Sequence, residues 1–462
     1  MATSRLIPLI IAAALFMENM DSTVIATSLP AIARDLGTDP IVLKLAFTTY
    51  LLSLTVFIPV SGWMADRFGA RQVFRAAIAV FTIGSLACGM ASSLGGLVAA
   101  RGLQGLGGAM MVPVGRIILL RTVPKSELVD ALAWLTIPAL MGPLVGPPVG
   151  GFITDHFGWR WVFWMNLPFG IIALTLATVL MPDTRVDDVP PLDWKGFILS
   201  GLGLSAFIFG LTVMGRSLLP AYAPTALVLF GAVMTGLYVR HANRSPKPIL
   251  DLRLLRIETF RAGIVGGSLF RIGVGAVPFL LPLMFQIGYG MSAFQSGMIT
   301  FVAAGGSMLM KLAAGRIIRR FGFRHLLIVN GILASGSIAM MGVLSSATPY
   351  LLAITLLFAG GFLRSLQFTA LNAMSYSDVD HAEASYATSL YTVVQQLSLS
   401  MGVVLAAFVL EAAQWVRSEA TLTPMDFTVA FCVVAACSLS ALCQFVTLSP
   451  NAGESVSGKG KI

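Results

Sequence analysis

The sequence predicts an all-α integral membrane protein that crosses the bilayer fourteen times. Of its 462 residues, 56% are hydrophobic and 11% are charged, whereas soluble domains average about 45–50% apolar and about 25% charged residues. The mean hydropathy of +0.86 excludes soluble and disordered classes of protein. All four cysteines lie within apolar runs, so we expect no disulfide framework, no metal cluster and no cofactor.

The spans follow from the length of the apolar runs, because a helix needs about 20 such residues to cross the hydrocarbon layer. The expected spans are 6–29, 44–64, 76–94, 97–118, 130–153, 161–181, 196–215, 221–239, 260–286, 292–314, 325–344, 349–372, 387–412 and 424–446. The start of the chain could pass for a signal peptide. Its apolar run continues through Glu18 and Asp21, however, so we expect a retained first helix.

Lysine and arginine residues predict the orientation, because they concentrate on the cytoplasmic side of membrane proteins. With the N-terminus in the cytoplasm, 21 of the 30 basic residues fall in cytoplasmic segments, 5 fall outside and 4 lie within spans. We therefore expect a multi-pass protein of the cytoplasmic (inner) membrane with both termini in the cytoplasm. The net charge of +9 is explained by this topology, and nucleic acid is not an expected partner.

An internal repeat divides the chain. GWMADRFGARQVF begins at Gly62 and GRIIRRFGFRHLL begins at Gly315, an offset of 253 residues. The predicted parts are a six-helix bundle at 1–181, a linker with two additional spans at 182–258, a second six-helix bundle at 259–448 and a cytoplasmic tail at 449–462. Transporters built from repeats place the substrate site at the repeat interface near the bilayer midplane.

The first copy of the repeat indicates a short charged turn. Gly62 and Gly69 permit close helix approach and a tight turn. Asp66, Arg67 and Arg71 are expected to form a charged clasp that holds one half against the other at the cytoplasmic face. The alternative is ordinary positive charge on the cytoplasmic side, with glycines that only serve the turn.

Two acids lie deep in a span, where an ionisable residue costs about 2.5–3.5 kcal/mol at the helix centre. Glu18 and Asp21 are three residues apart and therefore project from one face of the first helix. Two such carboxylates cannot both ionise cheaply away from water, so we expect one of them to carry a proton, Asp21 first. A purely structural pair, satisfied by neighbouring helices, is the alternative.

Basic residues within spans are the second set of candidates. Arg101 lies near the external end of the fourth span and could reach a carboxylate on the first. Arg271 is near the midplane, where it could be the counterion of the acids or contact an anionic substrate group. Arg364 could line the cavity or extend toward the interface. The remaining candidates for substrate binding, for which plain packing is the alternative, are Tyr50, Phe368, Gln395 and Gln396.

The fifth predicted span carries a run of glycines and prolines. Small residues let helices pack closely, and prolines remove backbone hydrogen bonds and bend the helix. A bent, close-packed seam of this kind could act as a pivot between the halves or as a seal against proton leak, with ordinary packing as the alternative. Its candidate residues are Gly142, Pro143, Gly146, Pro147, Gly150 and Gly151.

These motifs together resemble a known family. The pattern Gly62-x-x-x-Asp66-Arg67-x-Gly69-x-Arg71 resembles the signature loop of the major facilitator superfamily. Arg101-x-x-Gln104-Gly105-x-x-Gly108 is similar to a second motif, associated in that superfamily with proton coupling. The glycine and proline run looks like the antiporter motif of exporters. Met20-Asp21-Ser22-Thr23 and Trp159-Arg160-Trp161, through Asn166-Leu167-Pro168, resemble the fourteen-span drug:proton antiporter branch.

The resemblance implies the major facilitator fold and supports Asp21 and Arg101 as proton-coupling residues. One position departs from the pattern, because Arg319 occupies the place of Asp66 in the second copy of the repeat. A clasp in the C-terminal half therefore cannot pair its charges in the same way.

The expected function is a proton-coupled efflux transporter that exports small amphipathic compounds or drugs by alternating access. We expect it to be a monomer, not an enzyme, with protons, a small-molecule substrate and membrane lipid as its partners. The deep arginines equal or outnumber the deep acids, so an exporter of organic anions or of metal-organic acid chelates is an alternative. An uptake symporter and a non-transporting membrane receptor or scaffold are the others.

Overall fold

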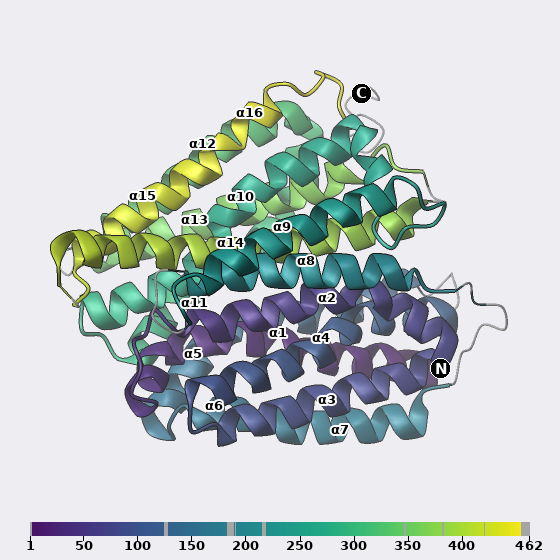
Figure 1. Ribbon diagram of the computed structural model, residues 1–462, viewed down its shortest axis with the longest axis horizontal. Helices are drawn as coiled ribbons and strands as arrows, with labels where there is room; N and C mark the ends of the chain where they lie inside the picture. Colours follow the sequence, from purple (N-terminus) through teal and green to yellow (C-terminus); the bar gives the residue numbers. More distant parts are fainter. Residues whose placement is uncertain are drawn as a thin grey trace. The chain divides into compact units, whose positions relative to one another are not determined.

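The computed structural model describes residues 2–123, 128–182, 189, 191–214, 219–345, 348–380, 383–419 and 421–453. Side chains are described within these ranges except at 2–6 and 128–140. Every regular element in the described part is a helix (Figure 1). Thirteen helices within the described ranges are long and apolar enough to cross a membrane. The remaining expected span, 130–153, lies within a helix of 29 residues, so the predicted multi-pass fold is confirmed.

Seven helices are described in the first half of the chain. They are α1 (Ala2–Asp35), α2 (Lys44–Phe68), α3 (Ala70–Met90), α4 (Leu94–Thr122), α5 (Leu128–His156), α6 (Arg160–Trp164) and α7 (Asn166–Leu180). The predicted span 161–181 is interrupted at Met165. Pro168, which has no amide hydrogen to donate, lies in the first turn of α7, where a missing donor costs nothing.

Two further helices follow, α8 (Trp194–Val213) and α9 (Ala223–Ala242). The rings of Trp63 on α2 and Trp194 on α8 meet edge to face, with centroids 6.0 Å apart, so α8 packs on the first half of the chain. Only 17% of the apolar window of α9 is buried inside the protein, against 67% for α1. Most of α9 is therefore available to contact lipid.

The second half consists of η1 (Leu252–Arg256), α10 (Glu258–Leu283), the π-helical turn η2 (Met284–Gly288), α11 (Ala293–Phe321), α12 (Phe323–Met341), α13 (Tyr350–Ser375), α14 (Ala384–Arg417), α15 (Pro424–Ser440) and α16 (Leu442–Phe445). Asp251 caps η1 by accepting the backbone N–H of Arg253 at 3.0 Å. Hydrogen bonds from the Arg253 side chain hold the pKa of the Asp251 carboxyl below its usual value.

The chain forms two compact units. The first comprises 1–213 and 219–238, and the second comprises 214–218 and 239–462. Each unit has its own apolar core. The contacts thus group α8 and most of α9 with the N-terminal helices. The division into two bundles, a linker with two helices and a tail, made from the sequence, remains a prediction.

The internal repeat is visible in the helix boundaries. α2 ends at Phe68 and α11 ends at Phe321, and both helices stop at a glycine with a positive φ. The φ angle is 92° at Gly69 and 71° at Gly322, a region that residues with a Cβ rarely adopt. The same 253-residue offset therefore relates both the sequence motif and the turn that it forms.

Candidate functional site

The candidate site is built on α1, which carries Glu18 and Asp21 within one turn. Both side chains are buried, with 8% and 3% of the residue exposed respectively. Burial of two carboxyl groups is costly unless other groups compensate them. Their direct partners come from α2, α4 and α7, all in the N-terminal unit.

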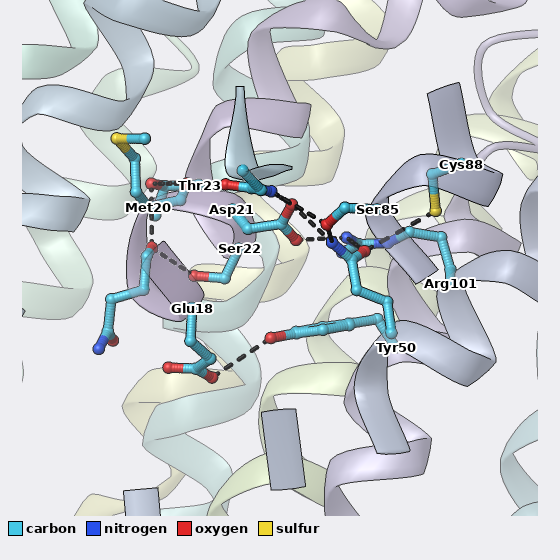
Figure 2. Close-up of polar contacts among 12 residues, drawn as sticks. Glu18, Met20, Asp21, Ser22, Thr23, Tyr50, Ser85, Cys88 and Arg101 are labelled. Atoms are coloured by element: carbon cyan, nitrogen blue, oxygen red, sulfur yellow. Dashed lines mark hydrogen bonds and ion pairs between the residues drawn. The ribbon is translucent and has the colours of Figure 1, made fainter. Parts of the chain in front are cut away.

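Asp21 forms an ion pair with Arg101 on α4. The guanidinium Nη1 lies 2.5 Å from Oδ2 of Asp21, and neither side chain is more than 1% exposed. Two amides complete the shell, since Gln104 Nε2 donates to Asp21 Oδ1 at 2.8 Å and Asn166 Nδ2 donates to the same oxygen at 2.7 Å. Ser85 accepts hydrogen bonds from both amides and ties them together. Figure 2 shows this network around the carboxylate.

The donors around Asp21 suit the ionised carboxylate. A guanidinium has no acceptor atom, and the two amides present their NH₂ groups. A protonated Asp21 would need a hydrogen-bond acceptor, so the side-chain amide of Gln104 or Asn166 would have to flip and present its oxygen. The Oδ1 atom of Asn166 is buried without a hydrogen bond in the described structure, because its amide turns the NH₂ group toward Asp21 and Ser85.

Glu18 has a different environment. Its Oε1 accepts a hydrogen bond of 3.2 Å from the hydroxyl of Tyr50 on α2, and no described cation forms an ion pair with it. A phenol can donate or accept. The contact can therefore be kept whether Glu18 is ionised or protonated, which is not true of the contacts of Asp21.

Tyr50 links the two carboxylates. Its ring lies against the guanidinium of Arg101, with 4.2 Å between the ring centroid and Cζ, while its hydroxyl reaches Glu18 (Figure 2). Only 1% of Tyr50 is exposed. The sequence suggested Tyr50 as a substrate contact, but the structure places it inside the carboxylate network.

Glycines of the second motif make room for this link. A Cβ at Gly108 would lie 3.1 Å from the Tyr50 hydroxyl and 3.6 Å from Cγ of Glu18. A Cβ at Gly105 would lie 2.7 Å from the backbone oxygen of Tyr50. The close approach of α4 to α2 at Tyr50 thus depends on these two residues.

The glycine run of α5 packs directly on α1 beside the site. A Cβ at Gly142 would lie 2.9 Å from the backbone nitrogen of Met20, and one at Gly150 would lie 2.8 Å from the backbone oxygen of Val24. One at Gly146 would overlap Thr23. The seam predicted from the sequence is thus seen as contact between α1 and α5, with Pro147 and Gly151 also buried and Pro143 half-buried.

The charged turn between α2 and α3 is tied within its own unit. Asp66 forms an ion pair with Arg121 at the end of α4, and Arg71 donates to the backbone oxygen of Thr178 on α7. Arg67 is exposed. The observed partner of Asp66 is thus Arg121 of the same unit, and the clasp between the two halves remains a prediction. A Cβ at Gly62, six residues before the end of α2, would lie 4.0 Å from Cδ1 of Ile117 on α4.

The candidates of the second unit form a separate set. Arg271 is fully buried and donates to the hydroxyl of Tyr391 and, at 3.3 Å, to the backbone oxygen of Gly263. Its Cζ is 5.6 Å from the ring centroid of Phe368. The counterion of Asp21 is thus Arg101, and the described partners of Arg271 are neutral. Nε of Arg271 is buried without a described hydrogen bond.

Arg364 and the two glutamines lie elsewhere on α13 and α14. Arg364 is buried and its Nη1 lies 3.7 Å from Sδ of Met341. Gln395 and Gln396 are half-buried. Nothing in the structure assigns these three residues a ligand.

Three members of the Asp21 network were not given a role from the sequence, although Gln104 and Asn166 lie in motifs that resemble the family. Gln104 lies three residues after Arg101, which puts both on one helix face, so its role could have been inferred from the spacing. Asn166 is a polar residue at the start of an apolar span and carried a weaker signal. Ser85 carried none, because serine is common within membrane helices.

Comparisons with known proteins agree with this architecture. The sequence model of the Major Facilitator Superfamily matches residues 11–403. A protein of Cronobacter sakazakii named "Putative multidrug resistance protein MdtD" is 38% identical over 404 residues, which cover 87% of this chain and 85% of that protein. A protein of the same name from Salmonella typhimurium is 37% identical over 406 residues, with the same coverage of both chains.

Solved structures show the same fold at low identity. A crystal structure of a D-xylose-proton symporter has a TM-score of 0.70 and 14% identity, and the match covers 97% of this chain and 98% of that one. The POT family transporter PepTSo has a TM-score of 0.71 and 15% identity, covering 96% and 97%. These neighbours are transporters and not enzymes. A multi-pass helical fold, a family match along most of the sequence and relatives well above 30% identity lead to one conclusion: the chain belongs to the Major Facilitator Superfamily of membrane transporters.

Proposed function

We propose that the chain is a proton-coupled antiporter that exports small amphipathic compounds across the cytoplasmic membrane by alternating access. The observation that carries this proposal is a pair of buried carboxyl groups on α1 with unequal partners. Ionisable residues at membrane depth are costly and mark functional positions, proton relays among them. The name shared by the relatives from Cronobacter and Salmonella supports drugs as the substrates.

The different partners of Glu18 and Asp21 suggest that the two carboxyl groups have different roles. Asp21, which accepts hydrogen bonds from Arg101, Gln104 and Asn166, fixes the geometry of the site. Glu18 gains and loses the proton, because its partner Tyr50 can serve both protonation states. This reverses the ranking that the sequence gave, in which Asp21 was the first candidate for the proton carrier.

The energy supplied by protons is sufficient for export. One charge that moves across the membrane gains about 2.3 kcal/mol per 100 mV, and about 1.4 kcal/mol supports a tenfold gradient of substrate. In the proposed cycle, the carrier loads substrate from the cytoplasm as Glu18 releases its proton inward. It then takes up a proton from outside as substrate leaves.

The remaining candidates have supporting roles in this proposal. The turn at Gly62, Asp66, Arg67, Gly69 and Arg71 and the α5 seam guide the conformational change. Arg364, Phe368, Gln395 and Gln396 contribute to substrate binding. We further propose that the protein acts as a monomer with both termini in the cytoplasm.

A second candidate function is the export of organic anions. It is favoured by Arg271, a fully buried cation whose described partners, Tyr391 and Gly263, are neutral. A buried charge without a counter-charge is costly, and a substrate carboxylate would offset that cost. Competition of cationic dyes and of organic anions for transport, in wild type and in Arg271→Ala, separates the two functions. Anions that never compete would eliminate the second.

The test of the main proposal is transport in inverted membrane vesicles with an imposed pH gradient. Wild type should accumulate substrate in proportion to the gradient, whereas Glu18→Gln should bind substrate but lose the response to the gradient. Gradient-driven transport at the wild-type rate in both Glu18→Gln and Asp21→Asn would contradict the proposal. Glu411→Gln is the matched control, because Glu411 lies on α14 of the other unit.

A further inference from the structure

The N-terminal unit contains an apolar groove that the transport mechanism does not use. Its volume is about 400 Å³, within the range of small-molecule sites. Met64 and Phe68 of α2 form one wall, residues 72–80 of α3 form the other, and Leu106, Gly107 and Met110 of α4 form the floor. Gln72 is the polar residue of the lining. The groove lies along membrane-spanning helices, so its surroundings are hydrocarbon rather than water.

Small residues create the groove. Gly107 allows α4 to approach α3, since a Cβ there would lie 2.7 Å from the backbone oxygen of Ala77. Ala76 is exposed on the α3 wall. From Gln72 to Val80 the wall rises about 12 Å along the helix, because each residue adds about 1.5 Å. The groove is thus elongated along the bilayer normal, as a hydrocarbon chain would be.

A positive charge lies close to the groove in the sequence. Arg67 is exposed, it lies one turn after Met64 on the same face of α2, and it directly precedes Phe68, the second α2 residue of the groove wall. The neighbouring acid, Asp66, is paired with Arg121 and does not neutralise Arg67. This end of the span is the one that the charge distribution predicts to be cytoplasmic, and the cytoplasmic leaflet is rich in anionic lipid.

We propose that this groove is a binding site for an anionic phospholipid, with an acyl chain between α2 and α3 and the phosphate at Arg67 and Gln72. The site does not depend on the proton-coupled function proposed above. It gives the exposed arginine of the turn a ligand, whereas Asp66 and Arg71 have partners within the protein.

The second unit supplies an internal comparison. At the 253-residue offset, Arg67 corresponds to Arg320 and Ala76 corresponds to Val329. The larger side chain reduces the space at the matched place on α12. Arg320 is exposed like Arg67, and each lies one residue before the end of its helix. Arg320→Gln is therefore a matched control that removes the same charge from the equivalent turn.

The experiment uses the full-length protein, purified in detergent and stripped of lipid. Phosphatidylglycerol or phosphatidylcholine is added in steps, and retained lipid is counted by native mass spectrometry alongside the midpoint of thermal unfolding. We expect phosphatidylglycerol to be retained and to raise the midpoint more than phosphatidylcholine does. Arg67→Gln should weaken phosphatidylglycerol binding about fivefold, which corresponds to the roughly 1 kcal/mol that one basic residue contributes at an anionic surface. Arg320→Gln should bind as wild type does.

Ala76→Phe tests the acyl chain separately, because it fills the groove at an exposed position and leaves Arg67 unchanged. We expect it to lower retention of both lipids. Equal binding of the two lipids by wild type, equal losses in Arg67→Gln and Arg320→Gln, or full retention in Ala76→Phe would each overturn the proposal. A changed KM for a drug in Ala76→Phe, with lipid retention intact, would instead make the groove a substrate site and also contradict it.

Discussion

The ring of Tyr50 lies against the guanidinium of Arg101, 4.2 Å from ring centroid to Cζ, while its hydroxyl donates to Glu18. One side chain from α2 thus contacts the partner of one carboxylate and the other carboxylate itself. Contact between a cation and an aromatic face is worth about 2 kcal/mol or more when both groups are desolvated. Tyr50 therefore holds Arg101 in place through its ring and serves Glu18 through its oxygen, and the two roles can be separated by mutation.

Tyr50→Phe removes the oxygen and keeps the ring. The ion pair of Asp21 and Arg101 should persist, and the loss of one buried hydrogen bond should cost about 1 kcal/mol of stability. Ionised Glu18 loses its donor, so the pH at which transport is half-maximal should move upward. Initial transport rates in vesicles across a range of pH measure this shift. Tyr391→Phe removes a hydroxyl in the other unit and should leave the profile unchanged; equal shifts in both variants would refute the role of Tyr50.

Asp21→Asn should lower the stability of the protein although it hardly changes the shape of the side chain. The amide occupies the same space, but it leaves Arg101 buried without a counter-charge, which costs about 3–5 kcal/mol. The double variant Asp21→Asn, Arg101→Gln removes both charges and should recover most of the thermal stability in detergent without recovering gradient-driven transport. The interaction energy from this cycle measures the ion pair. If the double variant is less stable than either single one, the pair is not the source of the loss.

The sequence could predict much of this arrangement, and the reasons are physical. Fourteen apolar runs, the repeat at 253 residues and the two intramembrane acids follow from the cost of polar groups in hydrocarbon. The approach of Arg101 to α1 was also expected, because a buried cation near buried acids has few other partners. Spacing along one helix could not predict which residue pairs with each acid. That pairing depends on how α2, α3, α4 and α7 are placed around α1.

Two residues show this limit. Tyr50 was expected to contact substrate, which remains a prediction, and its contacts with Glu18 and Arg101 were not foreseen, because an aromatic residue within a span gives no sign of the direction that its side chain faces. Arg271 was a possible counterion because it occupies the repeat position of Glu18, yet Arg101 holds the aspartate. Repeat symmetry relates backbone turns such as Gly69 and Gly322, where φ demands glycine, more reliably than it relates charges.

Asp66→Asn tests whether the turn between α2 and α3 acts in the conformational change or only in the stability of the protein. The side chains of Asp66 and Arg121 are 35% and 30% exposed, and ion pairs at this exposure contribute at most about 1 kcal/mol. The thermal midpoint should therefore change little, whereas the transport rate should fall if the turn guides the conformational change. Asp35→Asn, which breaks an exposed pair with Arg160 at the other end of α1, controls for loss of an exposed pair. An unchanged rate in Asp66→Asn would remove this turn from the mechanism.

Gly146→Ala tests whether the α5 seam positions the carboxylates. The added Cβ would overlap the hydroxyl of Thr23, two residues beyond Asp21, so α1 and α5 must separate or Thr23 must turn. Overpacking of this kind costs about 1–3 kcal/mol, and it should lower both the thermal midpoint and the gradient-driven transport rate.

The double variant Gly146→Ala, Thr23→Ala removes the obstructing oxygen and should restore both quantities in large part. Gly236→Ala on α9 adds the same methyl group where no atom lies within 4 Å, and it should be neutral. Loss of transport in Gly146→Ala that Thr23→Ala does not rescue would mean that the seam acts through some contact other than α1. In that case the α5 glycines would not be what holds Asp21 against Arg101.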